Sequence, residues 1–277
     1  HHRGFQGFEH RAAEKYLSAQ GISKPSTPIL APEFSNPLFL KTCCKALRSS
    51  GQRSFPKGLS GLTQLFEFYL ESVENRIAVR KQYSPAEKIV QNALLGFSLR
   101  LYPDHLSGIP IGDARKLINE FDIAPQKGGD DLFSLLLHEG VLAEDISYKD
   151  DKNGHPVIRY TYERFSDVLV ARQILGDHDS STVTTIFDEE QPLGQILRDR
   201  GVYQVAGIVE ALFIAIAEKF KIELIDLIPE NAKVSPWEIS ELFESTVLWR
   251  SPDSFSDRTL EILNKNVGNT EYSSPAL

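Results

Sequence analysis

The sequence predicts a mainly α-helical protein that contains one β-hairpin. Three observations carry this prediction. Apolar residues recur at helical spacing along most of the 277 residues. Several of these segments begin at Asn-Pro or Ser-Pro pairs, which combine an N-cap side chain with proline at the first helical position. Strand-like segments are confined to residues 141–162, where Asn153-Gly154 is a strong hairpin signal.

Residues 1–83 are expected to form a small helical domain of three helices. The first helix covers about residues 8–20 and is followed by Gly21, a residue suited to a left-handed C-cap. Asn36-Pro37 opens the second helix, which runs to residue 48. The third, at residues 60–81, carries apolar residues along one face. The region between the first two helices is rich in Pro and Ser and is predicted to be a loop.

Residues 84–177 are expected to form a winged-helix domain with a following helix. Three helices, at about residues 84–101, 113–121 and 130–138, precede two strands, at residues 141–149 and 156–162. Three helices followed by a hairpin is the order of a winged helix, which we place at residues 84–162. A further helix covers residues 163–175.

Residues 178–277 are expected to be α-helical, with helices at about residues 192–200, 202–220, 235–250 and 256–266. The Ser- and Thr-rich segment 177–185 is the best candidate for a linker. We expect the apolar helices 202–220 and 235–250 to pack together, with Trp237 and Trp249 in the second of them.

Composition limits the class of protein. No apolar run is long enough to cross a membrane and no signal peptide is visible, which predicts a cytoplasmic protein without a membrane partner. The adjacent Cys43 and Cys44 point about 100° apart on a helix, so we expect buried thiols rather than a disulfide or a metal site. The chain contains no Met, even at position 1, and is expected to be a piece of a longer chain.

Charge is divided unevenly along the chain, whose net charge is −8. Residues 1–83 hold 12 Lys and Arg against 6 Asp and Glu, a net charge of +6. Residues 84–277 hold 18 against 32, a net charge of −14. This asymmetry coincides with the predicted boundary at residue 83 and argues against DNA binding by the acidic part.

The common catalytic motifs are missing. The sequence has no G-x-x-x-x-G-K-[ST], G-x-S-x-G or H-E-x-x-H motif and no paired C-x-x-C. Its histidines are scattered, and His105 and His178 lie beside aspartates in polar turns, where solvated loop residues are the simpler interpretation. We therefore predict neither catalytic residues nor a metal site.

A winged helix raises the question of DNA binding, which the charges disfavour. The third helix usually enters the major groove and needs Lys or Arg against the phosphates. Here it is flanked by Asp130, Asp131 and Glu139 and carries no Lys or Arg. The wing offers Lys149 and Lys152 against two aspartates. Nucleic acid is thus an unexpected partner, although a winged-helix DNA-binding transcriptional regulator and a helical protein-interaction scaffold both stay as alternatives.

Two segments resemble one family. Residues 32–41, Pro-Glu-Phe-Ser-Asn-Pro-Leu-Phe-Leu-Lys, resemble the motif that follows the nucleotide-binding domain of STAND NTPases, relatives of the AAA+ ATPases. Residues 160–171 are similar to the aromatic-x-His-x-x-Phe-Gln-Glu-x-Leu-x-Ala motif that ends the winged helix of NACHT-type members. The family order is nucleotide-binding domain, helical lid domain, winged helix and sensor region, which the predicted order of elements matches over residues 8–175.

The resemblance implies a nucleotide-contacting set of residues. Pro37 takes the place of the lid proline that sits against the nucleotide. Tyr162 takes the place of the histidine that reaches the β-phosphate of ADP, and it can donate one hydrogen bond but carries no positive charge at pH 7. Either Tyr162 keeps a weaker contact, Arg164 supplies the charge, or this branch locks differently. Without the resemblance, Asn36-Pro37 is simply a helix start and Phe165 and Leu169 are core residues.

The implied function is a nucleotide switch. ADP would bridge an upstream nucleotide-binding domain, the lid and the winged helix, and ligand recognition by the C-terminal region with ATP exchange would let the winged helix swing away and the protein oligomerise. Bacterial members, including the AVAST-type anti-phage proteins, then trigger an effector. ATP and ADP are the expected ligands of the full-length protein, whereas residues 1–277 alone are expected to bind no cofactor and to lack ATPase activity. A net positive lid would suit the neighbourhood of a polyphosphate.

Overall fold

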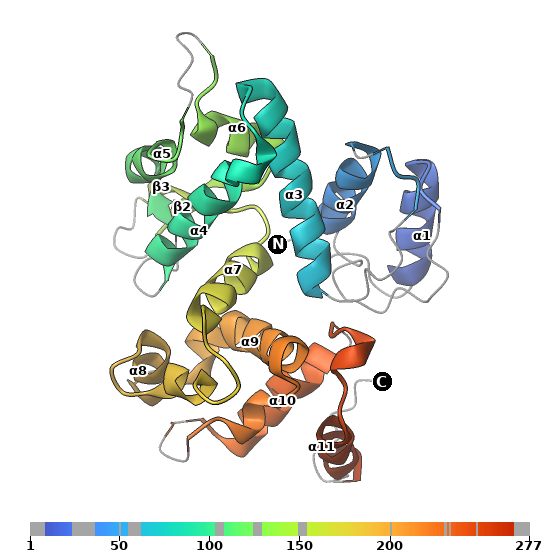
Figure 1. The fold of residues 1–277 in the computed structure, drawn as a ribbon, viewed down its shortest axis with the longest axis vertical. Coiled ribbons are helices and arrows are strands. Elements are labelled where there is room, and N and C mark those ends of the chain that lie inside the picture. Colours follow the sequence, from blue (N-terminus) through green and yellow to red (C-terminus); the bar gives the residue numbers. More distant parts are fainter. Residues whose placement is uncertain are drawn as a thin grey trace. The chain divides into compact units, whose positions relative to one another are not determined.

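The computed structural model of the protein describes residues 9–23, 37–49, 51–54, 62–102, 108–123, 129–148, 154–199, 201–229, 232, 234–247 and 249–268. The chain is mainly helical with one small antiparallel sheet, which confirms the predicted fold class (Figure 1). It divides into two compact units, residues 1–59 with 64–170 and residues 60–63 with 171–277. The domain boundaries predicted after residues 83 and 177 stay predictions, and each unit is described by itself.

The first unit begins with three helices, α1 (Glu9–Ala19), α2 (Pro37–Ser49) and α3 (Leu62–Lys81), close to the predicted ranges. Helices α1 and α2 pack on each other, with Leu17 and Leu47 fully buried. Both cysteines are buried and free, as expected for structural thiols. Burial raises the pKa of Cys44 to about 11, so this thiol stays protonated and unreactive at neutral pH.

The first unit then continues as a winged helix. The elements follow in the order α4 (Ile89–Leu101), β1 (Ile109–Pro110), α5 (Ile111–Asn119), α6 (Leu132–Glu139), β2 (Leu142–Ser147) and β3 (His155–Tyr160). The strands form an antiparallel sheet in the order β1-β3-β2, with Leu142 opposite Tyr160 and Ile109 opposite Ile158. The three helices and the β2–β3 hairpin confirm the prediction. The sequence missed β1, because two residues, one of them proline, show no alternation.

The helix predicted to start at Ser84-Pro85 begins later. One 3-10 turn covers Pro85–Glu87, and Lys88 then adopts a left-handed conformation (φ 52°), so the regular helix α4 starts at Ile89. The free backbone N–H groups of residues 90 and 91 donate to the carboxylate of Glu74 on α3, at 3.3 and 3.0 Å. The buried carboxylate of Glu74, on another helix, thus caps the start of α4 in place of a local N-cap side chain.

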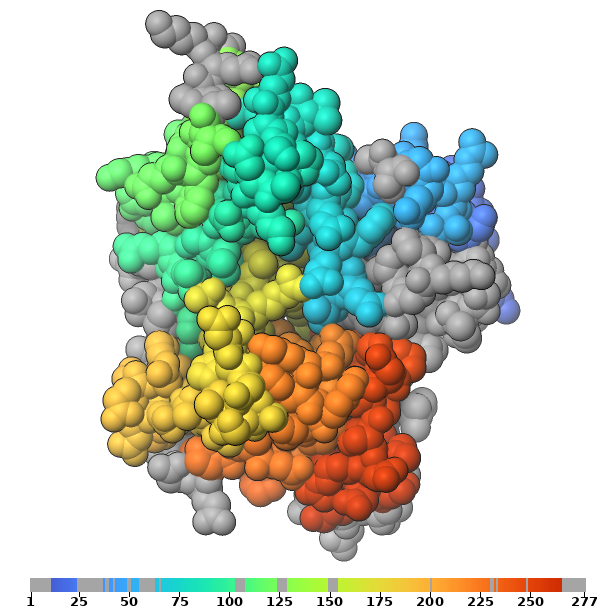
Figure 2. Space-filling model, viewed as in Figure 1, coloured from blue at the N-terminus to red at the C-terminus, as the bar shows by residue number. Residues whose placement is uncertain are grey.

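The second unit is helical. It starts within α7 (Arg164–Leu175) and contains α8 (Pro192–Asp199), α9 (Ala206–Phe220), α10 (Pro236–Val247) and α11 (Asp257–Gly268), joined by the 3-10 turns η3 (Val183–Phe187), η4 (Val202–Val205), η5 (Leu224–Asp226) and η6 (Pro252–Ser254). Helices α9 and α10 pack together as predicted, with the rings of Phe213 and Phe243 6.1 Å apart. Figure 2 shows α9, α10 and α11 (orange to red) as one continuous surface on the face drawn.

Three details of the second unit differ from the prediction. The helix expected at residues 202–220 is broken into η4 and α9. The expected linker 177–185 ends in η3, whose Val183 is buried and whose entry is capped by the carboxylate of Asp179. Helix α10 ends at Val247, so Trp249 lies beyond it and is buried, whereas Trp237 is exposed.

Gly194 provides a test of the packing within the second unit. A Cβ at this position of α8 would lie 2.5 Å from the backbone oxygen of Phe187 and even closer to that of Asp188. Because backbone atoms have little room to yield, we expect Gly194→Ala to lower the free energy of unfolding by about 3 kcal/mol. Urea unfolding followed by Trp fluorescence measures this directly, since both Trp residues lie in the second unit.

The matched control is Gly112→Ala in α5, where an added Cβ meets no atom within 4 Å. Alanine has the higher helix propensity, so we expect this variant to be neutral or stabilised by up to about 1 kcal/mol, as judged by far-ultraviolet circular dichroism. Equal effects of the two substitutions would contradict the close approach at Gly194.

Candidate functional site at helix α3

The three residues assigned to nucleotide contact lie on two parts of the first unit. Tyr162 is in the turn after β3, and Arg164 is the first residue of α7. Pro37 is the half-buried first residue of α2. The preceding motif residues 32–36 lie outside the described residues. The structure thus places Tyr162 and Arg164 together in one turn and Pro37 on a separate helix.

Tyr162 joins an aromatic cluster with helix α3. Its ring centroid lies 6.0 Å from that of Phe66 on α3 and 5.8 Å from that of Phe165 on α7, edge-on in both cases. Phe165 in turn lies 4.6 Å from Phe66 and stacks on Tyr69 at 4.8 Å. Such geometries are favourable for aromatic pairs beyond their buried area. The position that the resemblance assigns to nucleotide sensing is therefore a contact between α3 and the start of α7.

Arg164 takes part in an ion pair with its own helix. Its Nη1 atom lies 3.8 Å from Oδ2 of Asp167, one turn along α7, and both side chains are half-buried. A phosphate that recruited this guanidinium would have to compete with Asp167 for it. The charge on Arg164 is therefore less available than the sequence alone indicates.

At the other end of α3, cations converge on a buried carboxylate. The side chain of Glu139, at the end of α6, is only 2% exposed. It accepts hydrogen bonds from Lys45 Nζ of α2 at 2.6 Å and from Arg76 Nε of α3 at 2.9 Å, and Arg80 Nη2 lies 4.0 Å from its second oxygen. Both oxygens of the carboxylate therefore face positive charge.

The pKa of Glu139 reflects this environment. Burial by itself would raise the pKa, but the hydrogen bond from Lys45 and the charge and hydrogen bond of Arg76 outweigh burial, and the pKa is lowered. Glu139 is therefore ionised at neutral pH and depends on its partners for stability.

A second buried ion pair lies close by on α3. Lys81 Nζ donates to Asp122 Oδ2 at 2.7 Å, and the two side chains are 5% and 6% exposed. Asp122 also accepts the backbone N–H of Leu132 at 3.1 Å, which caps the start of α6. Lys81 reaches the carbonyl of Asp130 at 3.3 Å. Asp122 and Asp130, which both precede α6, are thereby fixed to the end of α3.

These contacts lie at both ends of the helix that would read DNA. Of α6, Leu132, Phe133, Leu135, Leu136 and Glu139 are buried, and its first turn is capped by Asp131. Asp131 is bound by Arg115 and by Ser134 and Asn119, whose hydrogen bonds outweigh partial burial and lower its pKa to about 2. In the wing, Arg159 pairs with Asp145 and Glu163. The predicted lack of a basic surface on this helix is therefore reinforced by packing.

Sequence reasoning did not find the Glu139 cluster. Lys45 and Arg76 are 94 and 63 residues away from Glu139, so no spacing rule connects them. The available signal was the charge asymmetry, in which a basic first part precedes an acidic second part. The positive charge of residues 1–83 was related to a neighbouring polyphosphate, whereas part of it is paired with acidic side chains inside the first unit.

The arrangement holds elements together rather than assembling a reaction centre. Over the described ranges, no group of three or more His, Cys, Asp or Glu side chains is placed to bind a metal ion. Likewise, no described helix has the length and apolar character needed to cross a bilayer. The groups described can donate hydrogen bonds and supply positive charge. Tyr162 lies near one end of α3, and the paired cations lie near the other.

Comparison of the chain with protein-family models, curated proteins and solved structures gives no match. The fold and the site define the class in structural terms alone. The chain is a helical protein with a winged helix, and the third helix of that winged helix is held by ion pairs from preceding helices. A function has to be argued from these contacts and from the two motifs.

Glu139 is the sharpest test of the ion-pair cluster. We expect Glu139→Gln to lower the free energy of unfolding by about 2 kcal/mol at pH 7, because Lys45 and Arg76 lose their counter-ion. The pKa of Glu139 is lowered in the folded state, so its contribution is complete above the unfolded value of about 4.3 and disappears as the pH falls through the folded value. The difference between wild type and variant should therefore be largest at neutral pH and shrink as the pH falls below about 4.

Urea unfolding by circular dichroism at pH 7, 5 and 3 measures this dependence. Glu163→Gln is the control, because Glu163 is 80% exposed and its pair with Arg159 spans 3.4 Å. An exposed pair of this kind contributes less than about 1 kcal/mol. A pH-independent effect of Glu139→Gln would show that shape, and not charge, matters at this position.

Proposed function

We propose that this chain is the regulatory lid and winged-helix part of a STAND-type NTPase, which couples ADP or ATP binding to oligomerisation in bacterial signalling or anti-phage defence. The observation that carries the proposal is the position of Tyr162. The residue that the resemblance assigns to nucleotide sensing packs against Phe66 of α3, where the proposed lid meets the end of the winged helix. The element order of the family and the fold of residues 89–160 support it further.

In this proposal the nucleotide is held by a separate domain and only touched by residues 1–277. The hydroxyl of Tyr162 donates a hydrogen bond to the β-phosphate of ADP, and Pro37 packs against the nucleotide from the lid. Arg164 adds positive charge where it is released from Asp167. A nucleotide shifts the equilibrium between two states only by its difference in affinity for them, so these contacts must exist in one state and be absent from the other.

DNA recognition is not proposed. The helix α6 that would enter the major groove carries no Lys or Arg, and its Glu139 is paired with cations from α2 and α3. DNA binding would bring this helix and its acidic flanks against phosphates of the same charge.

The proposal is tested in the full-length protein by Tyr162→Phe, which keeps the ring packing on Phe66 and removes only the hydroxyl. Loss of one hydrogen bond to a charged phosphate costs about 1.5 to 3 kcal/mol, so we expect ADP to bind at least about tenfold more weakly. Tyr162→His should bind ADP at least as tightly at pH 6, where the imidazole carries a charge. Calorimetry with the purified protein measures both.

Tyr148→Phe, which removes an exposed hydroxyl at the end of β2, is the control and should leave ADP affinity unchanged. If Tyr162→Phe and Tyr162→Ala both keep the wild-type affinity, Tyr162 makes no nucleotide contact and the site assignment is wrong.

The proposal also predicts that residues 1–277 alone do not hydrolyse ATP. The sequence has no phosphate-binding loop, and Tyr162 and Arg164 can hold but not cleave a phosphate. Phosphate release above the buffer background by the purified chain would contradict this. The same assay with the full-length protein is the positive control.

A further inference from the structure

Two large aromatic side chains of the second unit face solvent. Tyr203 in η4 is 63% exposed and Trp237 in the first turn of α10 is 54% exposed. The other tryptophan, Trp249, is only 7% exposed, so the unit can bury such a ring. Exposed Trp and Tyr are typical of the residues that dominate binding at protein interfaces.

Trp237 lies among glutamates of its own helix. It precedes Glu238 in sequence and lies one helical turn before Glu241, so Trp237 and Glu241 share a face of the helix. The negative charges of Glu238 and Glu241 also add to the desolvation that raises the pKa of Tyr203. We call Trp237, Glu238 and Glu241 the acidic aromatic face.

The charge of this face is not balanced within its own helix. Residues 236–247 include three glutamates, at 238, 241 and 244, and no Lys or Arg. Glutamates three residues apart are neighbours on a helix and repel one another. The exposed side chain of Glu241 has no ion-pair or hydrogen-bond partner among the described residues. A cation brought to this face from outside would relieve that repulsion.

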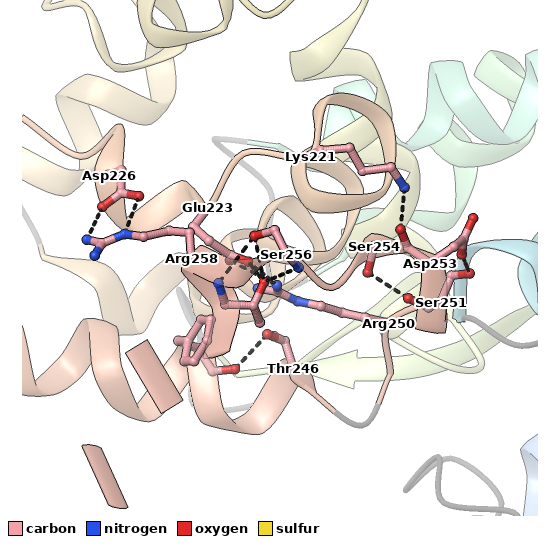
Figure 3. A network of polar contacts seen from close by, with 12 residues as sticks. Lys221, Glu223, Asp226, Thr246, Arg250, Ser251, Asp253, Ser254, Ser256 and Arg258 are labelled. Atoms are coloured by element: carbon pink, nitrogen blue, oxygen red, sulfur yellow. Dashed lines mark hydrogen bonds and ion pairs between the residues drawn. The ribbon is translucent and has the colours of Figure 1, made fainter. Parts of the chain in front are cut away.

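Three cations of the second unit have partners away from this face. Arg250 is fully buried and donates to both oxygens of Glu223 at 2.9 Å, and Arg258 binds Asp226 at 2.7 Å (Figure 3). Lys221 donates to the carbonyl of Asp253 at 2.8 Å, as Figure 3 also shows. These three side chains therefore do not neutralise the acidic aromatic face.

We propose that the acidic aromatic face binds a lysine- or arginine-bearing segment of a partner protein. The indole face of Trp237 attracts an ammonium or guanidinium group by cation–π interaction, and the exposed carboxylate of Glu241 pairs with it, while Glu238, which caps α10 by accepting the N–H of Ser235 at 2.7 Å, adds negative charge nearby. The sign of the charge excludes nucleic acids and anionic membranes as the partner, because both would be repelled. This inference stands on the second unit and does not depend on the proposed nucleotide switch.

The test uses the full chain and a ten-residue oligolysine peptide as the probe, titrated at physiological ionic strength and followed by Trp fluorescence. Binding at the proposed face should change the emission of the exposed Trp237, and Trp237→Phe should abolish the change while the buried Trp249 still emits. We expect Trp237→Ala to weaken binding at least about fivefold and Glu241→Lys at least about tenfold, measured by calorimetry.

Glu144→Lys is the matched control, because it makes the same change of net charge at an exposed carboxylate on β2, in the first unit. It should weaken binding less than about threefold. Equal weakening by Glu144→Lys and Glu241→Lys would show diffuse attraction to an acidic protein and would overturn the proposal, as would a failure of the peptide to bind.

A second measurement separates a foreign partner from another copy of the chain. Sedimentation without peptide should give a monomer at all concentrations tested. Concentration-dependent association that Glu241→Lys abolishes would mean that a second copy occupies this face and would overturn the assignment to a separate basic partner.

Discussion

The first unit depends on the neutralisation of one buried carboxylate, that of Glu139 at the end of α6. An ion removed from water costs several kcal/mol unless opposite charge and hydrogen bonds replace the lost hydration. Lys45 and Arg76 supply both, from α2 and α3 respectively. The position of α6 relative to two preceding helices is thereby fixed by charge as well as by apolar packing. Lys81 and Asp122 form a second buried ion pair at the end of α3, and Asp122 in turn binds the backbone N–H of Leu132 at the start of α6.

This constraint changes the interpretation of the charge asymmetry. A net charge of +6 over residues 1–83 pointed towards a polyphosphate beside the lid. Lys45, Arg76, Arg80 and Lys81 instead meet acidic residues between positions 122 and 139, so a third of the basic residues in this part have internal partners. Of the acidic residues that argued against DNA binding, Glu139 is the counterpart of three of those cations. Exposed residues such as Lys41 can still meet an external anion. The positive surface is therefore smaller than the net charge of +6 implies.

Local signals predicted most elements, because helix periodicity, caps and the hairpin are short-range properties. The winged helix followed from their order. Long-range contacts had no such signal. Glu139 looked like one more surface acid of a helix end, and nothing near it in sequence showed that cations 63 and 94 residues earlier would cover it. Lys88 broke a helix whose start at Ser84-Pro85 was chemically reasonable, because Glu74 caps a later start. The candidate site was predicted only by resemblance, which gave positions but not their neighbours.

The contacts of α3 also limit how a switch in this protein could move. If the winged helix separated from the lid, Glu139 and Asp122 would lose Lys45, Arg76 and Lys81, and the rings around Phe165 would be exposed. Breaking buried ion pairs costs several kcal/mol, about as much as the roughly 5.5 kcal/mol of differential binding that a complete two-state shift requires. The whole difference in nucleotide affinity between the two states would therefore be needed to separate the lid from the winged helix. Residues 64–170 belong to one compact unit, and a movement that carries the proposed lid and winged helix together keeps all of these contacts. In the proposed switch, Tyr162 and α3 would therefore face the nucleotide or leave it as one surface.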